Sequence, residues 1–137
     1  MSRIITPESA AKERTQYQRA IILALRELMG QTGIDQSSYD LAAFIALMVE
    51  AIDASIDQSV AAWEKRGYWI KADRFRREWL WTVNLGGRIR TALADDNWDE
   101  VRAVAAQLIT RLAKVKMPAR HKLGTPWVGA WEKLSRS

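Results

Sequence analysis

Three arginines and one tryptophan make the strongest candidate for binding chemistry in this sequence. On a helix that advances 100° per residue, Arg74, Arg77, Trp81 and Arg88 share one face. A guanidinium group binds phosphate in a planar fork and an indole stacks on a base, so this face fits nucleic acid. Basic residues that would strengthen such a contact lie further along the chain, at Lys114, Lys116, Arg120 and Lys122.

Ordinary packing explains the same residues and is the favoured interpretation. Asp73 and Glu78 are spaced to pair with Arg77 and Arg74 at i, i+4, which is how exposed helices are commonly stabilised. A neighbouring helix or a second copy of the chain would bury Trp81. An acidic protein partner is a third interpretation of the basic face, and nucleic acid is expected less strongly than packing.

Two further arginines, Arg76 and Arg90, approach the apolar face of the same predicted helix. A buried cation needs a partner, because an unpaired one is costly. We therefore expect a buried ion pair between these arginines and acidic residues of the N-terminal half of the chain. A ligand carboxylate or phosphate is the alternative partner.

Groups that could perform catalysis or hold a metal are poorly placed. Glu50, Asp53, Asp57 and Glu64 lie opposite the apolar stripe of their predicted helix, so they are expected to face solvent. His121 lies in a basic segment, where an orienting carboxylate is hard to supply. No nucleophile elbow or phosphate loop occurs, and cysteine is absent. The sequence predicts no catalytic residue, no cofactor and no metal.

Helical periodicity accounts for the whole chain. Tyr17, Ile21 and Leu28 illustrate the apolar stripe of the first predicted helix, and nothing alternates as a strand would. The third predicted helix is apolar on several sides and central. The expected helices run from about Pro7 to Met29, from Asp35–Ser38 to Gly67, from Tyr68–Trp69 to about Ala94 and from a cap within Asp95–Asn97 to about Lys116, with a short one after Thr125 and Pro126.

Several local features give these helices their expected shape. Thr6 is predicted to cap the first helix ahead of Pro7. The second helix, at about 1.5 Å per residue, would be roughly 45 Å long, so it should overhang the first or bend near Ser55 to Ser59. Gly86 and Gly87 indicate a close helix crossing within an unbroken third helix, or else a break there.

Composition separates the chain into two halves of opposite charge. Residues 1–60 carry five Lys/Arg against eight Asp/Glu, and residues 61–137 carry sixteen against eight, within a net charge of +5. Acidic and basic helices could pack side by side, or the basic half could meet an acidic partner. With no signal peptide and no spanning segment recognised, a cytoplasmic protein without a membrane partner is expected.

The fold class that follows is all-α: a four-helix bundle with a long central helical hairpin and a short C-terminal helix. One domain is expected over residues 1–137, with the bundle at 6–116 and a basic segment at 117–137. The favoured function is a non-enzymatic protein–protein interaction or structural role, with a homodimer formed through the hairpin and the terminal helix. A nucleic-acid-binding module is the alternative.

Overall fold

The computed structural model describes residues 7–137, and all regular structure within them is helical. The all-α prediction is therefore confirmed. Thr6, the predicted cap of the first helix, lies outside the described residues. The helices are α1 (Pro7–Met29), α2 (Gln36–Lys65), α3 (Trp69–Glu78), α4 (Trp81–Ala94), α5 (Trp98–Arg111) and α6 (Ala130–Ser135).

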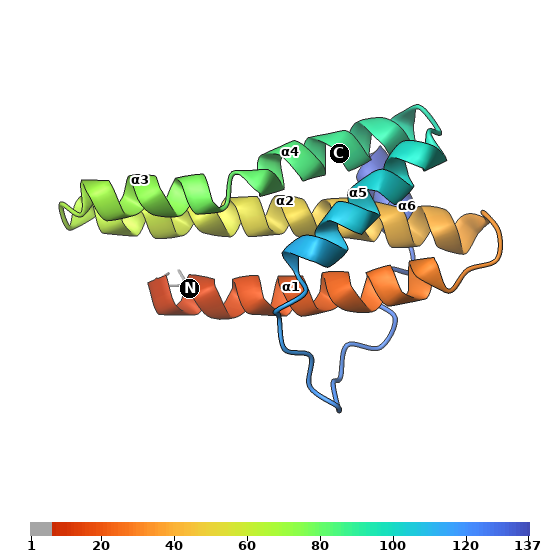
Figure 1. Cartoon of the computed structure of the whole chain (residues 1–137), viewed down its shortest axis with the longest axis horizontal. Helices are drawn as coiled ribbons and strands as arrows, with labels where there is room; N and C mark the ends of the chain where they lie inside the picture. Colours follow the sequence, from red (N-terminus) through yellow and green to blue (C-terminus); the bar gives the residue numbers. More distant parts are fainter. Residues whose placement is uncertain (1–6) are drawn as a thin grey trace.

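The longest helix, α2, is the centre of the molecule. It packs against α1, α3, α4 and α6, while α5 packs mainly on α4. Figure 1 shows α1 on one side of α2, and α3 followed by α4 along the other. Asp35 caps α2 by accepting from the backbone N of Ser38 at 3.2 Å, and Ser38 Oγ accepts from the backbone N of Asp35 at 3.1 Å.

The expected overhang of α2 is present, without a break in the helix. Its thirty residues form one helix, and the α2–α3 hairpin extends past the first described residue of α1 (Figure 1). The hairpin turns at Gly67, whose φ of 80° is left-handed and favours glycine. Ser55 and Ser59 are buried small residues on the side of α2 that faces α1.

The core is one cluster that draws on α1, α2, α4, α5 and the C-terminal segment. Ile45, Val49 and Ile52 of α2 are completely buried, as are Ile21 of α1 and Ile89 of α4. Burying a side chain of this size contributes about 1.5–3 kcal/mol relative to leaving it exposed. The apolar stripes read from the sequence therefore face one another around α2.

The predicted third helix is two helices, α3 and α4, and the expectation of an unbroken helix was wrong. The break lies at Trp79 and Leu80, where the carbonyl oxygen of Trp79 accepts from Thr82 N at 3.1 Å and Thr82 Oγ1 at 2.8 Å. In an unbroken helix Trp79 and Trp81 would point about 200° apart. Their ring centroids here lie 5.8 Å apart, so the break lets both indoles pack together.

The glycine pair lies inside α4, and only its first member is at a helix crossing. A Cβ on Gly86 would lie 3.2 Å from Val49 Cγ1, whereas one on Gly87 would have nothing within 4 Å. The expected close crossing is therefore present at Gly86. The buried face changes phase at the α3–α4 break, so Val83, which continues the stripe of α3, is exposed.

Helix α5 ends earlier than the sequence predicted. Asn97 caps α5 by accepting from Glu100 N at 3.2 Å, as expected, but the helix ends at Arg111 and not near Lys116. Arg19 Nε of α1 donates to the Lys116 carbonyl oxygen at 3.1 Å. That contact draws the chain across α1 and away from the axis of α5 (Figure 1).

The short C-terminal helix is docked on α2. Trp127 and Leu134 are buried, and the backbone N of Trp131 donates to Asp40 Oδ1 of α2 at 3.0 Å. The apolar side chains of this segment are thus used within the molecule.

Candidate interaction surfaces

The predicted basic and aromatic face is not assembled as one surface. Arg77 pairs with Asp73 on α3 at 3.0 Å, and Arg88 of α4 pairs with Glu100 of α5 at 2.7 Å. The break between α3 and α4 separates the two pairs, so Arg88 points toward α5. The hydrogen bond between Arg88 and Glu100 raises the pKa of Arg88 and lowers that of Glu100. Arg74, the remaining arginine of the set, lines a hollow beside the α2–α3 turn.

Trp81, the aromatic member of that face, is half-buried. Its ring lies beside that of Trp79, and the guanidinium carbon of Arg111 lies 5.9 Å from its centroid. Contacts within the chain therefore cover part of the indole that the nucleic-acid interpretation needs.

Arg76 and Arg90 each pair with a carboxylate of α2. Arg76 Nη1 lies 2.7 Å from Asp57 Oδ1, and Arg90 Nη1 lies 2.7 Å from Glu50 Oε1. The side chains are 50% and 58% exposed in the first pair, and 35% and 43% in the second. The partners are acidic residues of the N-terminal half, as expected, but the expected burial was wrong.

The reason is the length of the arginine side chain, which reaches from α3 or α4 to a carboxylate at the rim of the helix contact. Pairs at such exposed positions contribute up to about 1 kcal/mol each. Asp53, which lies between the two paired carboxylates, is partly buried, and that burial is the main cause that raises its pKa. Within residues 7–137, no three His, Asp or Glu side chains cluster as a metal site would require.

Arg14 is the central polar group that sequence reasoning missed. Its side chain is 6% exposed, and Nη1 donates to Ser55 Oγ at 3.2 Å and to Ser59 Oγ at 3.5 Å. The guanidinium carbon lies 4.9 Å from the ring centroid of Phe75 and 5.4 Å from that of Trp79. Burial lowers the pKa of Arg14. One side chain thus joins α1, α2 and α3.

A second polar cluster holds the start of α2 against the α4–α5 turn. Tyr39 Oη donates to Asp96 Oδ1 at 2.5 Å, and Trp98 Nε1 donates to the same oxygen at 2.9 Å. Asp96 has a φ of 54°, a left-handed conformation that aspartate tolerates better than most residues. The Tyr39 ring also contacts Trp98 edge-on at 5.1 Å between centroids. The cluster is structural, since every group in it bonds within the chain.

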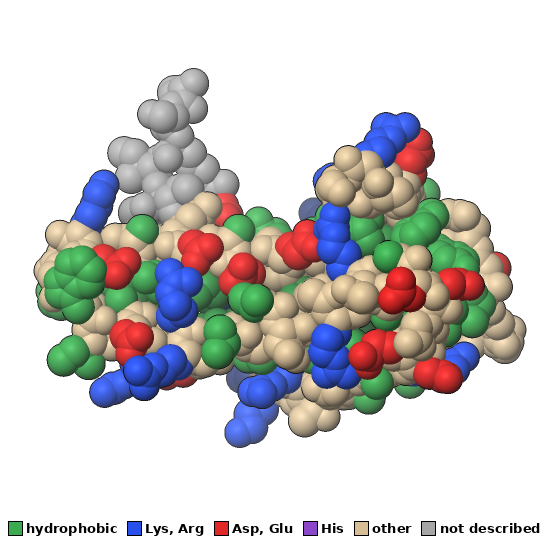
Figure 2. Space-filling model, turned by 90° about the horizontal axis from the view of Figure 1, so that it is seen from above, with side chains coloured by type: hydrophobic (Ala, Val, Ile, Leu, Met, Phe, Trp, Pro, Cys, Tyr) green, Lys and Arg blue, Asp and Glu red, His purple; other side chains and the backbone are tan. Residues whose placement is uncertain are grey.

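The hairpin end carries three consecutive exposed apolar side chains. Tyr68, Trp69 and Ile70 are 55%, 63% and 78% exposed. They follow the tight turn at Gly67, at the start of α3, where α2 is the described helix that packs alongside. Exposed basic side chains surround them: Lys65, Arg66, Lys71 and Arg74. Figure 2 shows green and blue side chains together at this end of the molecule.

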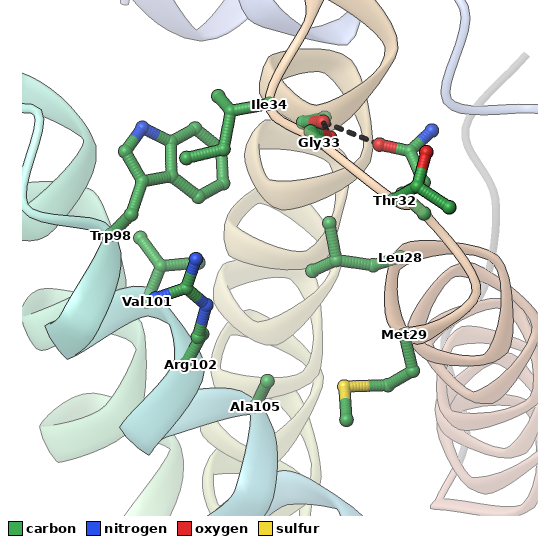
Figure 3. A pocket seen from close by; sticks show the side chains of 11 residues that line it. Leu28, Met29, Thr32, Gly33, Ile34, Trp98, Val101, Arg102 and Ala105 are labelled. Carbon is green, nitrogen blue, oxygen red and sulfur yellow. Dashed lines mark hydrogen bonds between the residues drawn. The ribbon is translucent and has the colours of Figure 1, made fainter.

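An apolar groove lies between α1 and α5. Figure 3 shows its upper part, where Leu28 and Met29 of α1 face Trp98, Val101 and Ala105 of α5 beneath the loop that carries Ile34. This part has a volume of about 230 Å³. A second cavity of about 460 Å³ continues from Met29, lined by Ile22, Leu25, Ile109, Leu112 and Val115 among others.

The groove presents mainly apolar surface, with one arginine in the lining of each cavity, Arg102 in the first and Arg26 in the second. Met29 is 61% exposed and Ile109 43%. Ser38 Oγ, at its upper end, donates to the Gln31 side chain and contacts the Gly33 carbonyl oxygen at 3.1 Å, so these polar groups are already bonded within the chain. We call the two cavities together the α1–α5 groove.

Comparisons with models of known families, with curated proteins and with solved structures find no match to this chain. None of the helices in residues 7–137 combines the length and the hydropathy that a bilayer-spanning segment needs. Any functional conclusion must therefore rest on the surfaces described above.

Proposed function

We propose that this protein is a non-enzymatic interaction protein that self-associates as a homodimer through the α1–α5 groove. The observation that best supports this proposal is the groove itself, where Met29 and Ile109 are exposed beside cavities lined mainly by apolar side chains. Exposed apolar surface in a concave patch is typical of interfaces between proteins. Because its polar groups are bonded to one another, the groove offers packing surface and not reactive groups.

The charge balance around the groove favours a second copy of the same chain. On α5, Arg102 pairs with Asp99 at 3.2 Å, and on α1 the adjacent Arg26 and Glu27 have opposite charges. A two-fold interface places each patch against its own copy, so a nearly neutral patch avoids like-charge repulsion. The hairpin end, with its basic side chains, lacks this property.

The shape of α5 also suits a two-fold contact. Ala103, Ala106 and Thr110 form an exposed stripe of small side chains that allows another helix to approach closely. Ile109 projects beside that stripe, next to the larger cavity of the groove. In the proposed dimer, α5 crosses its partner copy and each Ile109 enters the cavity of the other copy.

This interface differs from the one favoured by the sequence, which used the hairpin and the terminal helix. Trp127 and Leu134 of the terminal segment are buried against the protein's own core, so they are not available to a second copy. The concave apolar surface that remains is the α1–α5 groove, which Arg26 and Arg102 flank.

Light scattering coupled to size-exclusion chromatography tests the proposal. We expect a mass of twice the chain's 15.6 kDa for the parent, and a monomer for Ile109→Glu. A buried, unpaired carboxylate at the centre of the interface should weaken association by about 2 kcal/mol or more. Val128→Glu, which changes an exposed apolar side chain outside the groove, is the control and should remain a dimer.

A parent protein that is monomeric at every accessible concentration would overturn the proposal. So would an Ile109→Glu protein that dimerises as the parent does. Circular dichroism on both variants checks that the helices are intact.

A further inference from the structure

The apolar triplet Tyr68, Trp69 and Ile70 is exposed, so it adds little to the core, and it lies outside the interface of the proposed dimer. Ile70, at 78% exposed, is the most exposed large apolar side chain of the described residues, and Trp69 and Tyr68 precede it directly. Three such residues in sequence at the end of the longest axis are unusual on a soluble surface. They form a convex end, so a partner must present a broad surface to cover them.

Basic side chains lie directly behind the triplet. Lys65 and Arg66 end α2, and Lys71 and Arg74 occupy the first two turns of α3, all of them exposed. The nearby carboxylate of Asp73 is paired with Arg77 at 3.0 Å, which offsets its charge. Glu64 and Glu78 are the other carboxylates nearby, and Glu78 lines the adjacent hollow, so the end of the hairpin combines an apolar tip with a collar that is positive on balance.

A hollow beside the tip joins its apolar and basic parts. It has a volume of about 890 Å³, and its lining includes Trp63, Phe75, Lys71 and Arg74. The rings of Trp63 and Phe75 meet edge-to-face at 4.7 Å, and Lys71 Nζ lies 4.7 Å from the Trp63 centroid. This arrangement places two cations at the rim of an apolar depression, where an anionic head group could lie above buried hydrocarbon.

We propose that the end of the α2–α3 hairpin docks on an anionic phospholipid surface. Tryptophan and tyrosine favour the head-group region, where their rings are partly apolar and their polar atoms stay wet, while Ile70 enters the hydrocarbon boundary. The four cations face the lipid phosphates, and each Lys or Arg near such a surface strengthens binding. The contact is peripheral and independent of the α1–α5 groove.

Two other partners fit these residues less well. A second copy of the hairpin end would bring two positive collars together, which is repulsive. Single-stranded nucleic acid would use Trp69 and Tyr68 for stacking, but it leaves the aliphatic Ile70 without a partner. The absence of a recognised spanning segment led to the expectation of no membrane partner, but a peripheral contact needs no such segment.

Vesicle flotation with the full chain tests the proposal. We expect the parent to float with vesicles of phosphatidylcholine and phosphatidylserine, and to bind phosphatidylcholine alone much more weakly. The double variant Trp69→Ala/Ile70→Ser should lose about ten-fold or more in partitioning, since two apolar side chains no longer enter the bilayer. Lys71→Gln and Arg74→Gln should each lose about five-fold, and binding should fall with salt.

Val128→Ser is the matched control, because Val128 is similarly exposed but lies far along the sequence in the turn before α6. It should float as the parent does, and all variants should melt at the parent's temperature because the changed side chains are exposed. Brominated phosphatidylcholine in the anionic vesicles should quench parent tryptophan emission more than that of Trp69→Phe.

The proposal is overturned if the parent does not float with anionic vesicles, or floats equally with neutral ones. It is also overturned if the double variant partitions as the parent does. Binding of a single-stranded oligonucleotide without binding of vesicles would assign the hairpin end to nucleic acid.

Discussion

The two halves of α2 lie in different environments, although they belong to one continuous helix. Around the N-terminal half, α1, α4 and α6 pack closely and bury Ile45 and Val49 completely. Around the C-terminal half, α1 and α3 are the described helices that lie alongside, and the core there combines the buried Ile52, Ile56 and Val60 with Arg14, Ser55 and Ser59. The half with fewer covering helices thus buries a guanidinium group among its apolar side chains.

The surfaces follow the same division. The well-covered half leaves a concave, nearly neutral groove between α1 and α5, which suits a second copy of the chain. The thinly covered half leaves a convex, basic and aromatic end, which suits an anionic surface. One scaffold can therefore hold two contacts of different chemistry at opposite ends of its central helix.

The largest effect should come from removing the group that holds the hairpin half together. Arg14→Ala deletes the side chain that contacts Ser55, Phe75 and Trp79, and it leaves a cavity between three helices. We expect the free energy of unfolding to fall by about 2–4 kcal/mol, measured by urea denaturation. Amide hydrogen exchange should then speed up first in α3.

Arg14→Met is the control for that loss, because it keeps much of the side-chain volume without the charge. It should cost about 1.5 kcal/mol or less. An Arg14→Ala protein as stable as the parent would show that the hairpin half does not depend on this residue, and the contrast between the two halves would fail.

A change at the helix crossing should affect the other half. Gly86→Leu places a side chain against Val49, where even a Cβ would lie 3.2 Å from Cγ1, and should cost about 1–3 kcal/mol. Gly87→Leu is the matched control: its Cβ meets nothing within 4 Å, and the gain in helix propensity should stabilise α4 by up to about 1 kcal/mol. Equal denaturation midpoints for the two variants would contradict the close packing of α2 and α4.

The smallest effect is on the stability of the protein at acid pH, through Asp96, which bonds to Trp98 at the upper end of the groove. The hydrogen bond from Tyr39, with a second from Trp98, lowers the pKa of Asp96. A lowered folded pKa means that the stabilisation is present above the unfolded value of about 3.9, and is lost as pH falls through the folded value. Unfolding free energies measured against pH should show this loss in the parent and not in Asp96→Asn, whose amide tolerates the same backbone conformation.

The same bond has a consequence at alkaline pH. Its acceptor, Asp96, is the main cause that raises the pKa of Tyr39. That contribution is complete below the unfolded value of about 10, and is lost as pH rises through the higher folded value. Tyr39→Phe should remove the alkaline loss of stability and weaken the acid loss, because the hydrogen bond from Trp98 to Asp96 remains. If the parent and Tyr39→Phe show the same dependence of stability on pH, the cluster does not contribute in this way.

Helix positions were predictable from the sequence because caps and apolar periods are local properties. Pro7 and Met29 bound α1 as predicted, and Asp35 and Asn97 cap α2 and α5. The break at Trp79 was missed because neither glycine nor proline marks it. At the break, Thr82 bonds to the Trp79 carbonyl oxygen and the indoles of Trp79 and Trp81 pack together, an arrangement that an uninterrupted helical wheel does not contain.

The candidate surfaces were harder to predict, for two physical reasons. Long side chains such as those of Arg76 and Arg88 reach neighbours on other helices, so their position on a wheel does not fix their partner. Exposure also depends on which helices fail to cover a stripe, as at Met29 and Ile70. The role of Arg14 could have been predicted from the sequence, because Arg14 lies on the same helix face as Ile21, and Ser55 and Ser59 interrupt the apolar stripe of α2 that it meets.

The docking of α6 has a consequence for the order in which the chain folds. The hydrogen bond between Trp131 and Asp40 spans 91 residues, whereas α1 and α3 pack on α2, their neighbour in the sequence, and α4 packs on α2 across the single short helix α3. Loop closure over a longer stretch costs more entropy, so contacts between neighbours should form first. During synthesis, α1 to α5 can therefore assemble while the α6 site on α2 is still uncovered. That site is where a chaperone or a second nascent chain would find apolar surface before Trp127 and Leu134 close it.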